Sequence, residues 1–274
     1  MFNELEHLLL IVEHGTFTAA ARRAHLSQPA LSASIRRLED DVGARLLHRG
    51  RGGAELTAAG VAFLPRAKAA LAAIEDARRA VAEIEGLGAG EVRLGAGATA
   101  CTYLLPKTLA RYRKRYPGVR ISMLEGYRAR MEDNLRAGVI DLAIVTGDGD
   151  ELWRRDELIV VASPKIDARR AGFVTFPHGS ATRELLVKHF ADVDVVMELS
   201  GIAAVKSNVR AGIGKALLSR AAVDLDLNAG RLVEVPSRNT PIRRKLSIIH
   251  RGAERLPPAA AALRTMLLAR AKRR

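Results

Sequence analysis

The chain has 274 residues, 48% of them hydrophobic, which is enough for the cores of a small domain and a larger one. Its one cysteine, Cys101, excludes an internal disulfide framework. No apolar run approaches the roughly 18 residues of a membrane span, and the N-terminal segment lacks a basic leader with a cleavage site. We therefore expect a cytoplasmic protein with no membrane partner. The formal net charge is +14, yet residues 1–87 hold 11 basic and 11 acidic side chains, which leaves the whole surplus in residues 88–274.

Two short helical patterns separated by a tight turn, within Thr16–Arg49, indicate a helix-turn-helix. The first helix, residues 16–25, carries consecutive alanines whose small side chains allow a second helix to cross closely. The second helix begins after Ser27, a good N-cap, and has Pro29 in its first turn. Its apolar residues recur at helical spacing and form a buried stripe: Leu31, Ile35 and Leu38.

The other face of the second helix predicts contact with DNA, because a helix docked in the major groove meets base edges with its first turns. The residues expected to make base contacts are Gln28, Pro29, Ser32, Ala33 and Ser34. Arg36 and Arg37 are expected to meet phosphates. Residues 22–51 contain seven arginines and three acids, a local +4 patch that suits phosphate contact. A helical corner with a solvated polar face would show the same spacing.

A long helix is predicted from Ala58 to Glu85, before the helix breaker at residues 86–90. Its candidate seam alternates spacings of three and four and contains Leu64, Ala67, Leu71, Ile74, Arg78 and Val81. This pattern favours a dimerisation helix, which would let two recognition helices bind a two-fold site. An amphipathic helix packed on its own domain would show the same stripe.

After the break, strands and helices alternate, which predicts an α/β domain of two similar halves. In the first half, EVRLGAG, VRISMLE, IDLAIV and ELIVVAS are the strands; in the second, they are FVTF, DVVMEL, GKALLS and RLVEV, and KLSIIH returns to a helix at 257–270. The predicted boundaries are 1–58 for the DNA-binding domain, 59–88 for the linker, and 89–274 for the α/β domain. Its lobe I comprises 91–161 and 247–274, and its lobe II comprises 162–246, with chain crossings near 161–164 and 244–247.

A ligand of such a sheet binds outside the carboxyl ends of the strands, near free N–H groups of helix N-termini. The residues expected there are Thr99, Cys101, Thr102, Thr146, Ser180, Thr182, Arg183 and Ser200. They offer neutral donors, one guanidinium and no carboxylate, which suits a small anion. Alternatively, Thr99, Ser180 and Ser200 are only N-caps. The basic surplus of this region either is solvated surface or attracts anions.

The string AARRAHLSQPALSASIRRLEDDVGARLLHR, followed by GGAELTAAG, resembles the winged helix-turn-helix of the LysR-type transcriptional regulators. The resemblance implies base contacts from Gln28, Pro29 and Ser32, and a basic wing at Arg49 and Arg51. In this chain Ala33 and Ser34 replace the longer residues that family members often carry, so DNA shape is expected to contribute more to recognition.

The resemblance extends over the rest of the chain. The long helix stands where the family has its linker helix, and the paired halves resemble its periplasmic-binding-protein-like effector domain. TACTYLLP and GSATRELL resemble the family's ligand loops, the second in members that sense small oxyanions or carboxylates. The connections around residues 146–161 and 162–176 are shorter than is usual in the family, which predicts a reduced pocket or little ligand response.

Enzyme and cofactor sites find little support. The seven histidines lack metal-ligand spacing, and no nucleophile elbow or phosphate loop is present. GAGATA lacks the third glycine of a dinucleotide loop, so no cofactor is expected. Cys101 stands at a predicted helix N-terminus, which would lower its pKa, but it has no second cysteine for a redox pair.

We therefore expect a homodimer or dimer of dimers that binds double-stranded promoter DNA and responds to a small anionic effector between the lobes. A second hypothesis is a constitutive or architectural DNA binder whose effector domain no longer senses a ligand. A third is a solute-binding or catalytic α/β protein with a chance helix-turn-helix, which would show no salt-dependent DNA affinity.

Overall fold

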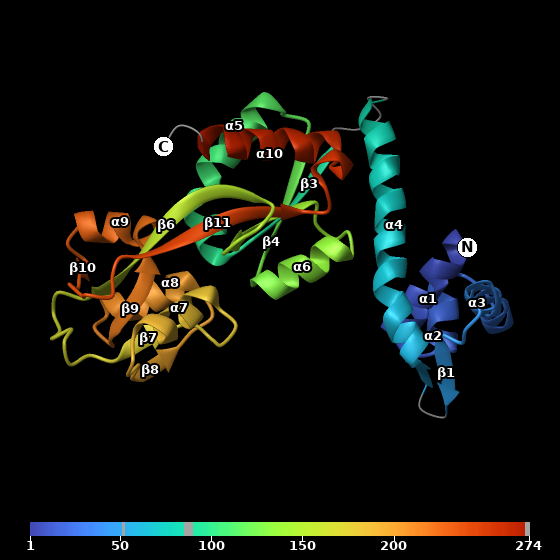
Figure 1. Ribbon diagram of the computed structural model, residues 1–274, viewed down its shortest axis with the longest axis horizontal. Helices are drawn as coiled ribbons and strands as arrows, with labels where there is room; N and C mark the ends of the chain where they lie inside the picture. Colours follow the sequence, from blue (N-terminus) through green and yellow to red (C-terminus); the bar gives the residue numbers. More distant parts are fainter. Residues whose placement is uncertain (51–52, 85–89, 272–274) are drawn as a thin grey trace. The chain divides into compact units, whose positions relative to one another are not determined.

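The computed structural model describes residues 1–50, 53–84 and 90–271 (Figure 1). The chain forms two compact units, the first chiefly Met1–Glu85 and the second chiefly Gly86–Leu135 and Ile140–Arg274. Each unit is described by itself. The predicted fold class is confirmed, since a helical winged helix-turn-helix and a long helix precede a two-lobed α/β domain.

The first unit consists of three short helices, a hairpin and the long helix. Its elements are α1 (Phe2–His14), α2 (Phe17–Arg23), α3 (Gln28–Val42), β1 (Leu47–Gly50), β2 (Gly53–Leu56) and α4 (Ala58–Ile84). Thr16 and Ser27 cap α2 and α3, because their hydroxyls accept hydrogen bonds from the N–H groups of Ala19 and Ala30. Helix α3 ends at Gly43, whose φ of 74° suits a residue without a side chain.

The core of this unit lies between α1, α3 and the start of α4. Leu8, Ile11, Leu31, Ile35 and Leu38 are fully buried there. One carboxylate oxygen of Glu39 accepts hydrogen bonds from the N–H groups of Leu46 and Leu47, at 2.7 and 3.1 Å. The last turns of α3 therefore hold the start of the antiparallel β1–β2 wing.

Helix α4 uses part of its predicted seam within its own unit. Ala67 is buried in the core of α1 and α3, and Leu71 packs against the same cluster. Ile74 and Val81, one heptad apart, are exposed in this single chain. Arg78 lies over the ring of Phe2, 4.9 Å from its centroid. The alternative of a helix packed on its own domain thus holds for one part of the seam.

The second unit is built on one mixed sheet. Its strands are β3 (Glu91–Ala96), β4 (Arg120–Glu125), β5 (Leu142–Thr146), β6 (Glu151–Ala162), β7 (Phe173–Thr175), β8 (Val195–Glu198), β9 (Lys215–Ser219), β10 (Val233–Glu234) and β11 (Ile242–His250). Their order is β4-β3-β5-β11-β6-β9-β7-β8, and β10 pairs with β6.

Helices cover this sheet. They are α5 (Pro106–Arg115), α6 (Arg128–Arg136), α7 (Ala181–His189), α8 (Ile202–Arg210), α9 (Arg220–Asn228) and α10 (Pro258–Ala271), with a π-helical turn at Ala100–Leu104 and a 3-10 turn at Ala253–Arg255.

The long antiparallel strands β6 and β11 run side by side and connect the two lobes (Figure 1). Strand β11 pairs with β5 of lobe I through residues 246–250, and β6 pairs with β9 of lobe II through residues 158–162. The chain therefore already pairs with lobe II from Leu158, before the crossing expected near 161–164. Separate apolar clusters fill the lobes, one containing Tyr112 and Leu263 and the other containing Val205 and Val223.

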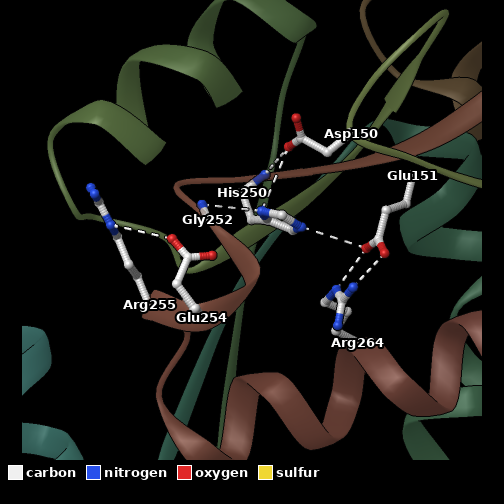
Figure 2. A network of polar contacts seen from close by, with 7 residues as sticks. All are labelled: Asp150, Glu151, His250, Gly252, Glu254, Arg255 and Arg264. Atoms are coloured by element: carbon white, nitrogen blue, oxygen red, sulfur yellow. Dashed lines mark hydrogen bonds and ion pairs between the residues drawn. The ribbon is translucent and has the colours of Figure 1, made fainter.

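A polar network ties β6 and β11 to α10 at the lobe I end of these strands (Figure 2). Arg264 of α10 donates hydrogen bonds to both carboxylate oxygens of Glu151, from Nε to Oε2 at 2.6 Å and from Nη2 to Oε1. The N–H of His250 donates to Asp150, and the Nδ1 of His250 accepts from the N–H of Gly252. The hydrogen bond from Arg264 lowers the pKa of Glu151.

In the described part of the chain, no helix combines the length and the apolar character needed to cross a membrane. Nor do the described histidine, cysteine, aspartate and glutamate side chains form a group of three able to hold a metal ion.

Candidate functional site

The first candidate site is the exposed face of α3. Gln28 and Pro29 are exposed in its first turn, followed by Ala33 and Arg36 along the same face. The Nε2 of Gln28 donates to the Oγ of Ser32 at 3.1 Å, and Ser32 is only 4% exposed. Ser32 is therefore buried and hydrogen-bonded within its own helix, so in this conformation it does not belong to the exposed face from which base contacts were expected. A flexible amide at the start of an exposed helix is suited to adenine recognition in a major groove.

Ser34 does not belong to that face. It is 1% exposed, and a hydrogen bond of 2.6 Å joins its Oγ to the Nδ1 of His7 on α1. The reason is helical geometry, because Ser34 lies three residues after Leu31 and four before Leu38, on the stripe that packs against α1. The expectation that Ser34 contacts DNA is therefore wrong for this conformation, and its hydroxyl links two helices instead. Burial lowers the pKa of His7.

The arginines predicted to meet phosphates differ in their surroundings. Arg36 is exposed, whereas Arg37 pairs with Glu4 of α1 through Nε and Nη2, both at 3.3 Å. Arg49 lies in β1, but its side chain is outside the described residues, and so is the whole of Arg51. The predicted basic wing therefore stays a prediction.

The second candidate site is a cavity of about 780 Å³ lined by both lobes of the second unit. It lies at the carboxyl ends of β3, β4 and β5 and at the N-termini of α6, α7 and α8. Five of the residues predicted to bind a ligand line it: Thr99, Thr146, Ser180, Thr182 and Ser200. Cavities of this size hold small organic ligands. The cleft is therefore open despite the shortened connections, and the expected reduction relative to other family members stays a prediction.

Three other predicted residues do not line the cavity: Cys101, Thr102 and Arg183. Cys101 packs in the core of lobe I and donates from Sγ to the carbonyl of Ala96, and burial raises its thiol pKa to about 11. The expected pKa-lowering effect of a helix N-terminus is thus outweighed by burial. The Nε and Nη1 of Arg183 are buried, without hydrogen-bond partners among the described residues.

One guanidinium in the cavity wall belongs to Arg244 of β11, which is 7% exposed. Its Nε and Nη2 lie 2.8 and 2.7 Å from the Oδ2 of Asp156 on β6. Nη2 also donates to the Oγ1 of Thr99, and Nη1 donates to the Oγ1 of Thr182, both at 3.2 Å. One buried side chain thus contacts a loop of lobe I and a helix of lobe II.

The cavity also contains carboxylates, contrary to the expectation that it has none. Glu125, Glu132 and Glu184 line it together with Arg128, Arg130 and Arg244. Glu132 accepts from the Nε of Arg128 at 2.7 Å. One signal was available in the sequence, since Glu125 is the last residue of the strand VRISMLE and the carboxyl ends of these strands form the cleft.

Comparisons with known proteins cover both units. A family model described as a bacterial regulatory helix-turn-helix protein of the lysR family matches residues 2–61, and one described as the LysR substrate binding domain matches residues 85–272.

Among curated relatives, the HTH-type transcriptional regulator CbbR of Rhodospirillum rubrum is 32% identical over 280 residues, covering 96% of this chain and 94% of that protein. A probable RuBisCO transcriptional regulator of Gracilaria tenuistipitata var. liui is 31% identical, covering 90% and 89%.

Two solved structures show the same fold at lower identity. CbnR, a LysR family transcriptional regulator, aligns with a TM-score of 0.70 at 21% identity and 99% coverage of both chains. Full-length LysG from Corynebacterium glutamicum with bound effector Arg aligns with a TM-score of 0.71 at 18% identity, covering 99% of this chain and 98% of that one.

Proposed function

The chain belongs to the LysR family of bacterial transcriptional regulators, which are DNA-binding proteins and not enzymes, and from this premise we propose that a small acidic effector in the lobe cavity controls how it binds promoter DNA in the cytoplasm. The single observation that carries the proposal is the cavity itself. Its walls come from two lobes joined by β6 and β11, so that a bound molecule would contact both. A ligand that binds one lobe arrangement better shifts the protein toward it.

The chemistry of one wall supports an acidic group in the effector. Helices α7 and α8 begin at this wall, and no side chain caps either N-terminus. Backbone N–H groups and the positive end of a helix dipole favour an anion. The hydroxyl of Ser180 is not used as a cap, which leaves it available to a ligand and weakens the alternative that this residue is only an N-cap.

We also propose that the regulator acts as a homodimer, or as a pair of dimers, assembled through α4. Ile74 and Val81 are exposed apolar residues one heptad apart on this helix, at 39% and 59% exposure. A second copy of α4 would bury such a stripe. Light scattering of the full chain and of an Ile74→Asp, Val81→Asp variant tests this, because the variant should lose the dimer while keeping its helix content.

The relative from Gracilaria tenuistipitata named above is called a probable RuBisCO transcriptional regulator, so the promoter of RuBisCO genes is the first target that we propose to test. Footprinting should be done on the DNA beside this gene and on such a promoter, with and without a panel of small carboxylic acids. The expected result is a protected region that changes in length or hypersensitivity with one acid.

The outcomes separate the competing functions. A footprint that no acid changes, together with no thermal shift, favours a constitutive DNA binder. The absence of salt-dependent DNA affinity would exclude a DNA-binding role altogether and favour a solute-binding protein. Gln28→Ala is the matched variant for specificity, since it changes the exposed helix face and leaves the cavity untouched.

A further inference from the structure

We propose that Arg244 is the positioning residue that turns the hydroxyls of Thr99 and Thr182 into a pair of donors for one singly charged acidic group of the effector. This inference rests on the proposed function, because it assigns a ligand class and a mechanism of lobe coupling to the same cavity. The residues lie on three separate segments: the loop after β3, the first turn of α7 and the crossing strand β11.

The guanidinium of Arg244 is held rigidly. Its Nε and Nη2 both contact the Oδ2 of Asp156, and the other carboxylate oxygen of Asp156 accepts from the hydroxyl of Ser219 at 2.8 Å. Arg244, Asp156 and Ser219 are 7%, 7% and 1% exposed. A planar guanidinium fixed at one edge has its remaining N–H groups aimed in set directions.

Those remaining N–H groups determine which way the two threonine hydroxyls point. A hydroxyl has one proton to donate and two lone pairs, and a guanidinium can only donate. Because Arg244 donates to Thr99 and Thr182, neither hydroxyl can direct its own proton back at the guanidinium. No other hydrogen bond within residues 90–271 uses either hydroxyl, and both residues line the cavity. Both protons are therefore available to an acceptor in the cavity.

The charges around this pair limit the acceptor to a singly charged group. The positive charge of Arg244 is already balanced by Asp156. Arg128 is paired with Glu132, and Arg130, Glu125 and Glu184 on the lining form no ion pair with any other described residue. The lining thus has no excess of positive charge for a bisphosphate or a dicarboxylate. A monocarboxylate accepts two O–H donors and sits at the positive end of α7.

The two donors come from different lobes, so a carboxylate that accepts from both holds the lobes at one separation. Thr99 follows β3 in lobe I, and Thr182 belongs to α7 in lobe II. Arg244 would act before binding, by keeping both hydroxyls oriented at the same point. Loss of Arg244 should therefore weaken carboxylate binding without removing any group that touches the ligand's acid.

The test uses pyruvate and inorganic phosphate as probes at matched ionic strength, with the full chain followed by calorimetry and thermal unfolding. Pyruvate should bind and raise the melting temperature, and phosphate should do so less. Thr99→Val and Thr182→Val should each weaken pyruvate binding about tenfold or more, and the double variant should be little worse than either single one. Strict additivity would mean that the hydroxyls do not act on one group.

Arg244→Lys keeps the positive charge but cannot make the same fork of hydrogen bonds, so this variant should bind pyruvate more weakly than the wild type. The double variant Arg244→Gln, Asp156→Asn removes both buried charges together, which avoids leaving a lone carboxylate and keeps the test valid if the single variant fails to fold. Arg243→Gln is the matched control, since Arg243 is the neighbouring arginine on β11, is 76% exposed and pairs only weakly with Glu157.

The results distinguish this inference from the function on which it rests. The role of Arg244 would be overturned by wild-type pyruvate affinity in the Arg244→Gln, Asp156→Asn variant, or by an equal loss of affinity in Arg243→Gln. The ligand class would be overturned if phosphate bound more strongly than pyruvate, or if the wild type did not bind pyruvate. DNA binding is measured separately by fluorescence anisotropy without a probe. If DNA affinity is absent there, the proposed function fails instead.

Discussion

Two single changes in α3 should separate sequence recognition from stability. Gln28→Ala removes the amide on the exposed face, and Ser34→Ala removes the buried hydroxyl that contacts His7. Both residues are polar members of one helix and lie six positions apart. The structure nevertheless assigns one to the solvent and the other to the α1–α3 interface.

The expected magnitudes follow from those surroundings. A bidentate amide–base contact contributes about 1–3 kcal/mol of discrimination, so Gln28→Ala should weaken binding to the specific site by about 5- to 150-fold. Its effect on stability should be small, because Gln28 is exposed and only its bond to Ser32 is lost. Ser34→Ala leaves the imidazole of His7 without a partner at that nitrogen, which costs about 1–3 kcal/mol of the free energy of unfolding.

Anisotropy titrations with the footprinted duplex and a scrambled duplex give the ratio of specific to nonspecific affinity, and urea unfolding gives the stability. Gln28→Ala should reduce the ratio at unchanged stability, and Ser34→Ala should do the reverse. The orientation of α3 would be refuted if Ser34→Ala lowered the ratio while the unfolding midpoint stayed constant. Equal losses on both duplexes for Gln28→Ala would show that this residue does not contact bases.

Three further changes test other parts of the structure. Gly60→Ala should lower the stability of the first unit strongly in urea unfolding, because an added Cβ would lie 2.1 Å from the carbonyl oxygen of Leu46. Gly50→Ala is the control, since an added Cβ there meets nothing within 4 Å and should leave the stability nearly unchanged. Cys101 should resist alkylation by iodoacetamide at pH 8 and become reactive only as the pH nears 11, and fast modification of the native protein at pH 8 would contradict its buried, raised pKa. Arg264→Gln should lower stability above pH 4.5, the usual pKa of a glutamate, and the difference from wild type should vanish at lower pH, because Glu151 has a lowered folded pKa and its stabilisation is lost as it becomes protonated. A difference that is unchanged at acid pH would rule out this pair as its source.

The sequence predicts the helices of the first unit well because their signals are local. Ser27, Pro29 and Gly43 mark the beginning and the end of α3, and the apolar stripe is the buried one. The error at Ser34 came from treating the first turns as one exposed surface. Its spacing from Leu31 and Leu38 already places it on the buried stripe, so this correction was available from periodicity alone.

The partner of an apolar stripe is not a local property. The seam of α4 follows the heptad spacing of a dimer, yet Ala67 and Leu71 pack on the core of their own unit, whereas the apolar residues Ile74 and Val81 remain exposed. Spacing determines which residues share a helix face and says nothing about whether the same chain or a second copy covers that face.

The cleft shows the same division between local and distant information. Thr99, Ser180 and Thr182 were predictable because a strand end or a helix start places each of them. The sequence places Arg244 only at a chain crossing, because its contacts are with Thr182 and Thr99, which lie 62 and 145 positions away along the chain. Arg183 is predicted because it follows the strand FVTF at the same helix start as Thr182, but on a helix adjacent residues point in different directions.

The distribution of charge explains why the DNA-binding unit should depend on assembly. Residues 1–87 carry equal numbers of acidic and basic side chains, and Glu4 engages Arg37 on the helix that would meet DNA. The long-range attraction of one such unit for a phosphate backbone is therefore weak, since that term grows with the number of phosphates neutralised. Two units held by paired α4 helices would add their short-range contacts on one DNA molecule and convert the second binding event into an intramolecular one. A regulator built in this way would gain affinity from geometry. An effector that changed the separation of the lobes would then alter DNA binding without touching the DNA.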